Sequence, residues 1–216
     1  MNKKACIFDM DGTLVDSMGY WERLAWEFLT GKGVTEELEP VLERIRAMTM
    51  LESAALFLES FGLQGTPESL AAEMNAMMDE HYRRDIPLKP GAAEYLAALT
   101  DRSVTLCVAT ATAEPLARDC LERLGVGEKF AFILSCDAVG AGKDRPDVFY
   151  EAARRLGLAP GDIAVFEDAI HAAETAKAAG FYTVGVYDEQ SRDSWEELSA
   201  LTDETIRDWE TAAKTL

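Results

Sequence analysis

The sequence predicts an α/β fold, a doubly wound parallel sheet of the Rossmann-like kind with a small inserted helical domain. Its 216 residues suit one domain with a modest insertion. Short apolar runs alternate with helical patterns over most of the chain, which is typical of a parallel sheet covered by helices. One segment with only helical patterns interrupts this alternation. We therefore expect an α/β core from residues 1–15 and 87–216 and a helical insertion over residues 16–86.

Five apolar runs of four to six residues predict the strands of the core. Short continuous apolar runs, as opposed to alternating ones, are typical of strands that are buried on both faces. We therefore expect helices on both sides of the sheet. The predicted strands are Ala5–Phe8, Val104–Ala109, Phe130–Leu134, Ile163–Phe166 and Tyr182–Val186.

Helical periodicity predicts four helices between these strands. A glycine follows three of them at the position where helices often end in a left-handed residue. The acidic, amphipathic stretch from Ser191 onward predicts a solvated helix at the C-terminal end. The four predicted core helices are Ala92–Leu99, Pro115–Leu124, Val148–Leu156 and Ala169–Ala179.

The insertion is rich in Leu, Glu, Met and Ala and contains no convincing strand. Turn residues separate its helical segments, and the chain returns to the core through the segment 86–91. Its methionines and aromatic residues are typical of the core of a helix bundle. The predicted helices of the insertion are Trp21–Leu29, Val41–Met48, Leu51–Phe61 and Leu70–Met78.

The charge of the chain limits its partners. Thirty-nine acidic and 21 basic residues give a formal net charge of −18, which repels nucleic acid and anionic membranes. No apolar run approaches the ~20 residues that cross a bilayer, and Asp9 interrupts the first apolar stretch, which argues against a signal peptide. The four cysteines form no Cys-x-x-Cys pair. We expect a cytoplasmic protein, a monomer or weak homo-oligomer, that binds neither nucleic acid nor membrane.

Polar residues directly after the apolar runs are the candidates for chemistry, because ligands of doubly wound sheets bind beyond the carboxyl ends of the strands. Carboxylates of this kind suit Mg²⁺, and a hydroxyl and an ammonium suit a phosphate group. The predicted site is therefore one for a divalent cation and a phosphoryl group. Its members are Asp9, Asp11, Thr110, Lys143, Glu167 and Asp168.

At these residues the chain resembles the haloacid dehalogenase-like hydrolases, in the branch with a helical cap inserted after the first motif. The segment from Asp9 to Ser17 is similar to the first motif almost letter for letter. Thr110 matches the second motif, Lys143 the third, and the segment from Phe166 to Ala169 the fourth. The resemblance covers nearly the whole chain. Among its departures, Ala111 stands where Asn or Ser often follows the hydroxyl of the second motif.

The resemblance implies a role for each motif residue. Asp9 attacks phosphorus and forms an aspartyl-phosphate, and Asp11 protonates the leaving oxygen and then activates water. Mg²⁺ is held by the Asp9 and Asp168 carboxylates and by the backbone carbonyl of Asp11, with Glu167 in support. The phosphate oxygens are held by Thr110, Lys143 and the backbone near Ala111.

The preferred function is a Mg²⁺-dependent phosphatase that hydrolyses a small phosphorylated metabolite. Asp11 argues against the dehalogenase branch, which lacks this second aspartate because halide leaves without a proton. The phosphonate-cleaving branch uses a cap lysine that forms a Schiff base. Lys32 lies in a Gly-Lys-Gly loop, and this position argues against that branch. A non-catalytic binding module on the same scaffold is disfavoured because every catalytic position is filled.

The main alternative is a sugar-phosphate mutase of the β-phosphoglucomutase type, which must bind a second phosphate and therefore needs convergent positive charge in the cap. The arginines that could supply it are Arg23, Arg44, Arg46, Arg83 and Arg84. The sequence does not name the substrate. Met48 and Thr49 lie near the position where related caps contact substrate, so they are candidates for substrate selection.

Overall fold

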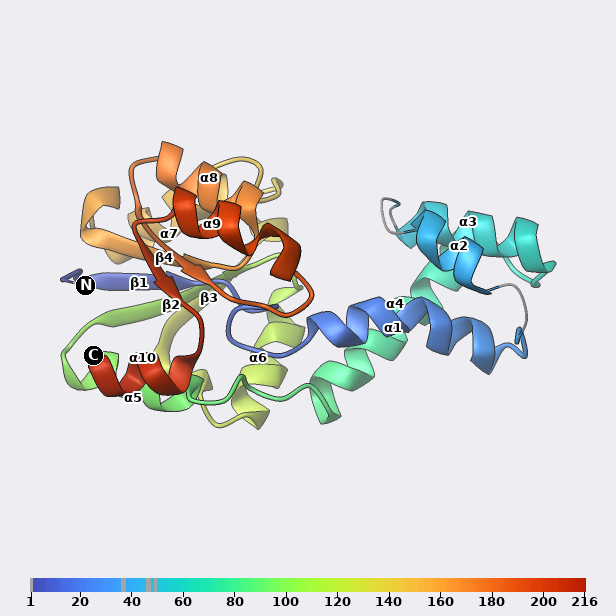
Figure 1. The fold of residues 1–216 in the computed structure, drawn as a ribbon, viewed down its shortest axis with the longest axis horizontal. Coiled ribbons are helices and arrows are strands. Elements are labelled where there is room, and N and C mark those ends of the chain that lie inside the picture. The colour runs from blue at the N-terminus through green and yellow to red at the C-terminus, as the bar shows by residue number, and fades with distance from the viewer. Residues whose placement is uncertain (1, 36–37, 46–47, 49) are drawn as a thin grey trace. The chain divides into compact units, whose positions relative to one another are not determined.

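The computed structural model describes residues 2–35, 38–45, 48 and 50–216, and the chain divides into two compact units (Figure 1). The core unit comprises Met1–Ser17 and Ile86–Leu216, and the cap unit comprises Met18–Asp85. The core unit thus runs to Ser17 before the cap unit and resumes at Ile86 after it. None of the described helices is long and apolar enough to cross a membrane.

The core unit contains a six-stranded sheet in which every neighbouring pair is parallel. The strand order is β3-β2-β1-β4-β5-β6. The chain winds outward from β1 to β3 and then returns to β4, so the winding direction reverses beside β1. Ligands of doubly wound sheets bind at such a reversal, beyond the carboxyl ends of the central strands. The strands are β1 (Ala5–Phe8), β2 (Thr105–Thr110), β3 (Phe130–Ser135), β4 (Ile163–Glu167), β5 (Tyr182–Val186) and β6 (Glu204–Ile206).

Helices cover both faces of this sheet (Figure 1). One face carries α5 (Ala92–Asp101), α6 (Glu114–Arg123) and α10 (Trp209–Thr215), and the other carries α7 (Asp147–Leu156), α8 (Ile170–Ala178) and α9 (Trp195–Leu201). Strands β1 and β4 are buried along their whole length because they are covered on both sides. The predicted fold class, a doubly wound parallel sheet with an inserted helical segment, is confirmed.

The C-terminal stretch differs from the prediction of a solvated helix. It contains α9, the edge strand β6 and α10, and Trp209 at the start of α10 is only 2% exposed. The acidic residues of this stretch suggest a solvated face, but its apolar residues pack on the core. The five predicted strands, in contrast, lie within one residue of the observed ones.

The cap unit consists of α1 (Met18–Gly31), α2 (Leu38–Ile45), α3 (Met50–Phe61) and α4 (Pro67–Arg84). Thr66 caps α4, and Pro67 occupies the first turn, where its missing N–H costs nothing. The rings of Phe28 and Phe57 stack at 6.2 Å between α1 and α3. Met74 is almost fully buried within the unit. The apolar residues of the insertion therefore form a helical core, as their spacing predicts.

Candidate active site

Three buried carboxylates lie together at the carboxyl ends of β1 and β4. Phe8 pairs with Phe166 across these strands, so the residues that follow, Asp9 and Glu167, come side by side. The backbone N–H of Asp9 donates to the carbonyl of Phe166 at 3.0 Å, which fixes this register. Ligand oxygens of Asp9, Glu167 and Asp168 all lie within 4.8 Å of one another. We call these three residues the acidic cluster.

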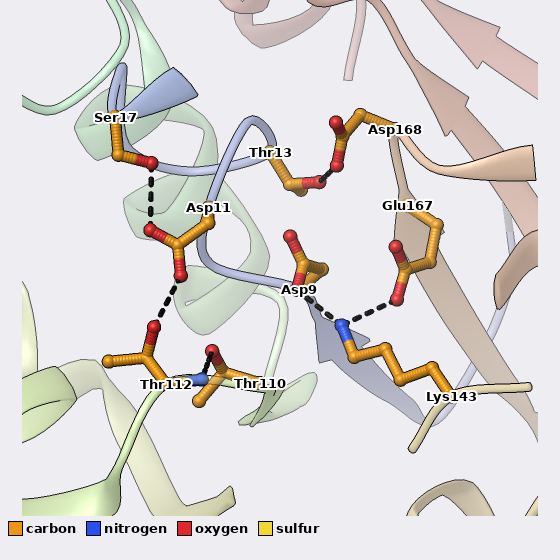
Figure 2. Close-up of polar contacts among 9 residues, drawn as sticks. All are labelled: Asp9, Asp11, Thr13, Ser17, Thr110, Thr112, Lys143, Glu167 and Asp168. Atoms are coloured by element: carbon orange, nitrogen blue, oxygen red, sulfur yellow. Dashed lines mark hydrogen bonds and ion pairs between the residues drawn. The ribbon is translucent and has the colours of Figure 1, made fainter. Parts of the chain in front are cut away.

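Lys143 brings a positive charge into the acidic cluster (Figure 2). Its Nζ donates to Oδ1 of Asp9 and, at 2.7 Å, to Oε1 of Glu167. Burial alone lowers the pKa of the Lys143 ammonium, but the two carboxylates outweigh this effect and raise its pKa above the usual range. Burial raises the pKa of Glu167 well above its ordinary value, and Lys143 opposes that rise. The ammonium therefore stays charged and compensates part of the negative charge of the cluster.

Asp168 is held by the loop that follows β1. The hydroxyl of Thr13 donates to Oδ1 of Asp168 at 3.0 Å. Gly12 has a φ of +78°, and a Cβ built there would lie 2.4 Å from Oδ2 of Asp168, so only glycine allows this close approach. Burial and the Asp9 charge raise the pKa of Asp168 to about 7, partly opposed by the hydrogen bond from Thr13.

Asp11 points away from the acidic cluster (Figure 2). One carboxylate oxygen accepts from the Ser17 hydroxyl at 2.7 Å, and the other accepts from the Thr112 hydroxyl, also at 2.7 Å. The backbone N–H of Thr112 donates in turn to the buried hydroxyl of Thr110 at 3.0 Å. This network places a carboxylate that can exchange protons beside the loop after β2.

The acidic cluster fits a hard divalent cation. It offers carboxylate oxygens from three side chains and hydroxyl support from Thr13, which is the donor chemistry that Mg²⁺ prefers in proteins. In the part of the chain that the structure describes, no other group of His, Cys, Asp and Glu side chains approaches a metal-binding arrangement. The four cysteines are buried free thiols.

Two networks hold most of the predicted site residues. Asp9, Lys143, Glu167 and Asp168 form one contact network, while Asp11 and Thr110 belong to the adjoining network around Thr112. Ala111 is exposed directly after β2. Met48 is partly exposed and belongs to the cap unit. Thr49 lies outside the described residues.

Met48 lines a cavity of about 150 Å³ within the cap unit. Most of the residues that line the cavity have apolar side chains, with Trp21, Ile45, Phe57 and Met74 among them. Ser53 is the one hydroxyl-bearing residue of the described lining. The cap unit therefore presents an apolar hollow beside Met48.

Some supporting contacts could not be predicted from the sequence. The pairing of Thr13 with Asp168 and that of Thr112 with Asp11 join residues far apart in the chain. The first-motif resemblance includes Thr13 and Ser17 but does not indicate their partners. Trp209 was missed altogether, although a large aromatic residue in an otherwise acidic stretch is a signal for burial.

Comparisons with known proteins identify the family of the chain. A family model described as haloacid dehalogenase-like hydrolase matches residues 3–180. The phosphorylated carbohydrates phosphatase of Thermotoga maritima is 29% identical over 82% of this chain and 82% of its own length. The β-phosphoglucomutase of Bacillus subtilis is 30% identical over 85% and 83%, and hexitol phosphatase A of Escherichia coli is 30% identical over 86% and 84%.

Solved structures share the fold at lower sequence identity. A crystal structure from Thermotoga maritima has a TM-score of 0.82 with 24% identity and covers 99% of both chains. The CbbY protein of Rhodobacter sphaeroides, solved in complex with phosphate, has a TM-score of 0.74 with 24% identity over 99% of this chain and all of its own. Both comparisons show that the fold recurs in other proteins.

Proposed function

Because the chain belongs to the haloacid dehalogenase-like hydrolase family, we propose that it is a Mg²⁺-dependent phosphatase that acts on a small phosphomonoester through an aspartyl-phosphate on Asp9. Relatives named as phosphatases support its assignment as a phosphoric monoester hydrolase. The observation that carries the proposal is the buried contact of Asp9 with Lys143 inside the acidic cluster. A carboxylate nucleophile and a phosphate-binding ammonium meet there, beside oxygen ligands for a cation.

The acidic cluster would hold Mg²⁺ through the carboxylates of Asp9 and Asp168, with the backbone carbonyl of Asp11 completing the protein ligands. Glu167, whose Oε1 faces Lys143, would support the site from the side. The cation would supply positive charge that offsets repulsion between the phosphate dianion and these carboxylates.

The reaction divides between two carboxylates. An oxygen of Asp9 attacks phosphorus, the P–O ester bond breaks, and Asp11 gives its proton to the departing alkoxide. Asp11 then takes a proton from water, whose oxygen attacks the aspartyl-phosphate and frees Asp9 and inorganic phosphate. Lys143, Thr110 and the backbone at Ala111 would hold the phosphate oxygens during both steps.

The charge of the cap unit favours hydrolysis over the mutase reaction. Residues 18–85 contain thirteen acidic and six basic residues, a poor environment for a second phosphate. Four of the cations that could bind it already face carboxylates of the same unit: Arg23 faces Glu27, Arg83 faces Asp79, Arg84 faces Glu80, and Lys32 faces Glu73. Arg44 lies exposed on α2, and Arg46 lies outside the described residues.

We assign substrate selection to the cap unit. Met48 lines an uncharged cavity of this unit, which supports its place among the residues that select the substrate. The net charge of −18 and the buried free thiols support a cytoplasmic enzyme that avoids nucleic acid and anionic membranes.

The test is a phosphate-release screen over sugar phosphates, nucleotides and small organic phosphates, with and without Mg²⁺. For a hexose 1-phosphate, we expect free sugar and phosphate in equal amounts, and no release in excess chelator. Calcium should support the reaction poorly because its looser coordination disturbs the in-line geometry. Isomerisation to the 6-phosphate that needs a bisphosphate primer and outpaces phosphate release would establish the mutase instead.

A further inference from the structure

Trp209 connects the C-terminal helix α10 to the acidic cluster. It lies outside residues 3–180, the segment that the family model matches. Its indole Nε1–H donates to the backbone carbonyl of Thr13 at 3.0 Å, and the hydroxyl of Thr13 donates to Oδ1 of Asp168, also at 3.0 Å. Thr13 is fully buried and Trp209 is almost so. Two consecutive buried hydrogen bonds therefore join Trp209 to a carboxylate of the cluster.

The indole ring also packs against the two residues that precede the other two carboxylates. Its centroid lies 6.2 Å from that of Phe8 and 5.9 Å from that of Phe166, and these two rings stack on each other at 4.3 Å. Phe8 directly precedes Asp9, and Phe166 directly precedes Glu167. Trp209 thus supports the strand ends that carry Asp9 and Glu167 in addition to the loop that holds Asp168.

Helix α10 is fixed in the position that this contact requires. The Asp208 carboxylate caps the helix by accepting from the backbone N–H of Thr211 at 2.7 Å. On its other side α10 contacts the turn at Gly91, where a built Cβ would lie 2.4 Å from the backbone N of Glu210. Tyr95 of α5 holds the indole at a centroid distance of 4.8 Å. The tryptophan is therefore clamped from several sides.

A buried tryptophan generally finds an acceptor for its N–H. Here the acceptor is the carbonyl of the residue whose side chain orients Asp168. We propose that Trp209 is a positioning residue for the Mg²⁺ site, which acts through Thr13 to hold Asp168 in place. This inference rests on the proposed function, because it takes Asp168 as a metal ligand.

The test compares Trp209→Phe, which keeps an aromatic ring and removes the N–H, with Trp195→Phe, a matched change at a half-buried tryptophan that packs on Tyr187. Mg²⁺ binding is measured by calorimetry without substrate. We expect Trp209→Phe to weaken binding by about tenfold, the lower end for residues that orient metal ligands, and Trp195→Phe to leave it unchanged. At saturating Mg²⁺ the KM for substrate should stay within about twofold of the parent, since the change acts on Asp168 rather than on substrate contacts.

A double-mutant cycle with Thr13→Val tests the path. If Trp209 acts through Thr13, adding Trp209→Phe to Thr13→Val weakens Mg²⁺ binding no further.

If Trp209→Phe does not fold, replacement of Trp209 by benzothienylalanine, in which sulfur takes the place of the N–H, tests the same bond at nearly unchanged shape. Additive effects on Mg²⁺ binding, or unchanged binding with a lowered unfolding midpoint, would overturn the inference and leave Trp209 as packing alone. A parent protein that binds no Mg²⁺ would overturn the proposed function itself.

Discussion

Lys143 holds its ammonium against Oδ1 of Asp9 inside the core unit, and both side chains are less than one-tenth exposed. Two segments that are far apart in the chain meet in this pair, because β1 presents Asp9 and the loop after β3 carries Lys143. Glu167 shares the ammonium at 2.7 Å. The two carboxylates raise the pKa of Lys143, so its ammonium keeps the positive charge that the proposed phosphate-binding role requires.

The first prediction concerns Asp9. Asp9→Asn should lower kcat by about 10⁴-fold or more, because an amide is neither a nucleophile nor an anionic ligand. Lys143 keeps Glu167 as its partner, so the fold should remain intact by circular dichroism. Beryllofluoride should trap the parent protein and not this variant. Asp101→Asn, at an exposed aspartate of α5, is the control. Turnover at the parental rate by Asp9→Asn would refute the nucleophile.

The second prediction is that the stabilisation of the protein by Mg²⁺ depends on pH. Burial and the Asp9 charge raise the pKa of Asp168 to about 7 in the metal-free protein, above the value of about 3.9 for an unfolded chain. Between these two pKa values the folded state therefore keeps a proton on Asp168 that the unfolded chain has lost. The stabilisation from protonated Asp168 is complete below the unfolded pKa and is lost as the pH rises through 7. Mg²⁺ needs the ionised form, so it competes with that proton.

The increase in unfolding temperature on adding Mg²⁺ should consequently be larger at pH 8 than at pH 6. Apparent affinity should fall by at most about tenfold per pH unit below 7 for one displaced proton. Thermal unfolding in chelator and in Mg²⁺ at both pH values measures this difference. In the Asp168→Asn variant, the increase in unfolding temperature on adding Mg²⁺ should be small at both pH values. An increase that is the same at pH 6 and pH 8 in the parent would show that Asp168 does not lose a proton on metal binding.

The fold was predictable because burial on both faces of the sheet leaves a clear pattern. Apolar runs such as Ala5–Phe8 and Tyr182–Val186 coincide with the observed strands β1 and β5. Strand β6 is only three residues long and lies at the edge of the sheet, so Glu204–Ile206 carries no such run. Trp209 likewise lies outside any apolar run, so its large aromatic side chain was the one local signal of its burial.

The site was predictable as a set of residues and not as a set of contacts. Parallel strands bring their carboxyl ends to one edge of the sheet, which places Asp9 beside Glu167 and Asp168 by topology alone. Nothing in the local sequence indicates that Asp11 faces Thr112, because this hydrogen bond depends on the path of the loop after β2. The roles of these residues remain predictions that the mutations here are designed to test.

The third prediction uses two glycines with the same backbone conformation. Gly12 has a φ of +78° and Gly125, which follows α6, has a φ of +73°. A side chain in this region costs about 1–2 kcal/mol of stability, so Gly12→Ala and Gly125→Ala should share that cost. Only at Gly12 would the added Cβ meet Asp168, whereas nothing lies within 4 Å of it at Gly125. Gly12→Ala alone should therefore lose activity and Mg²⁺ binding. Equal activity in the two variants would mean that the close approach of Gly12 to Asp168 has no role in activity.

The fourth prediction concerns the proton exchanged by Asp11. An alkoxide leaving group is strongly basic and needs a proton as the P–O bond breaks, whereas nitrophenolate can leave without one. General acid catalysis of this kind is worth about 10²–10⁴-fold. Asp11→Asn should therefore slow aspartyl-phosphate formation severely for alkyl phosphates and much less for p-nitrophenyl phosphate. Because the second step also uses Asp11, the variant should show a burst of nitrophenolate followed by slow turnover.

Thr112 offers a milder version of the same experiment. Its hydroxyl donates to Asp11 at 2.7 Å, so Thr112→Val misplaces the carboxylate without removing it, and Thr112→Ser retains the donor. We expect Thr112→Val to slow aspartyl-phosphate formation about tenfold more for alkyl phosphates than for p-nitrophenyl phosphate. A tenfold effect corresponds to the loss of one hydrogen bond worth roughly 1.4 kcal/mol. Thr112→Ser should restore the parental pattern, and Thr105→Val, at the exposed start of β2, should not alter it. Stopped-flow measurement separates the two steps. Equal slowing of the first step for both substrates, with no burst in Asp11→Asn, would mean that Asp11 positions the backbone and does not transfer the proton.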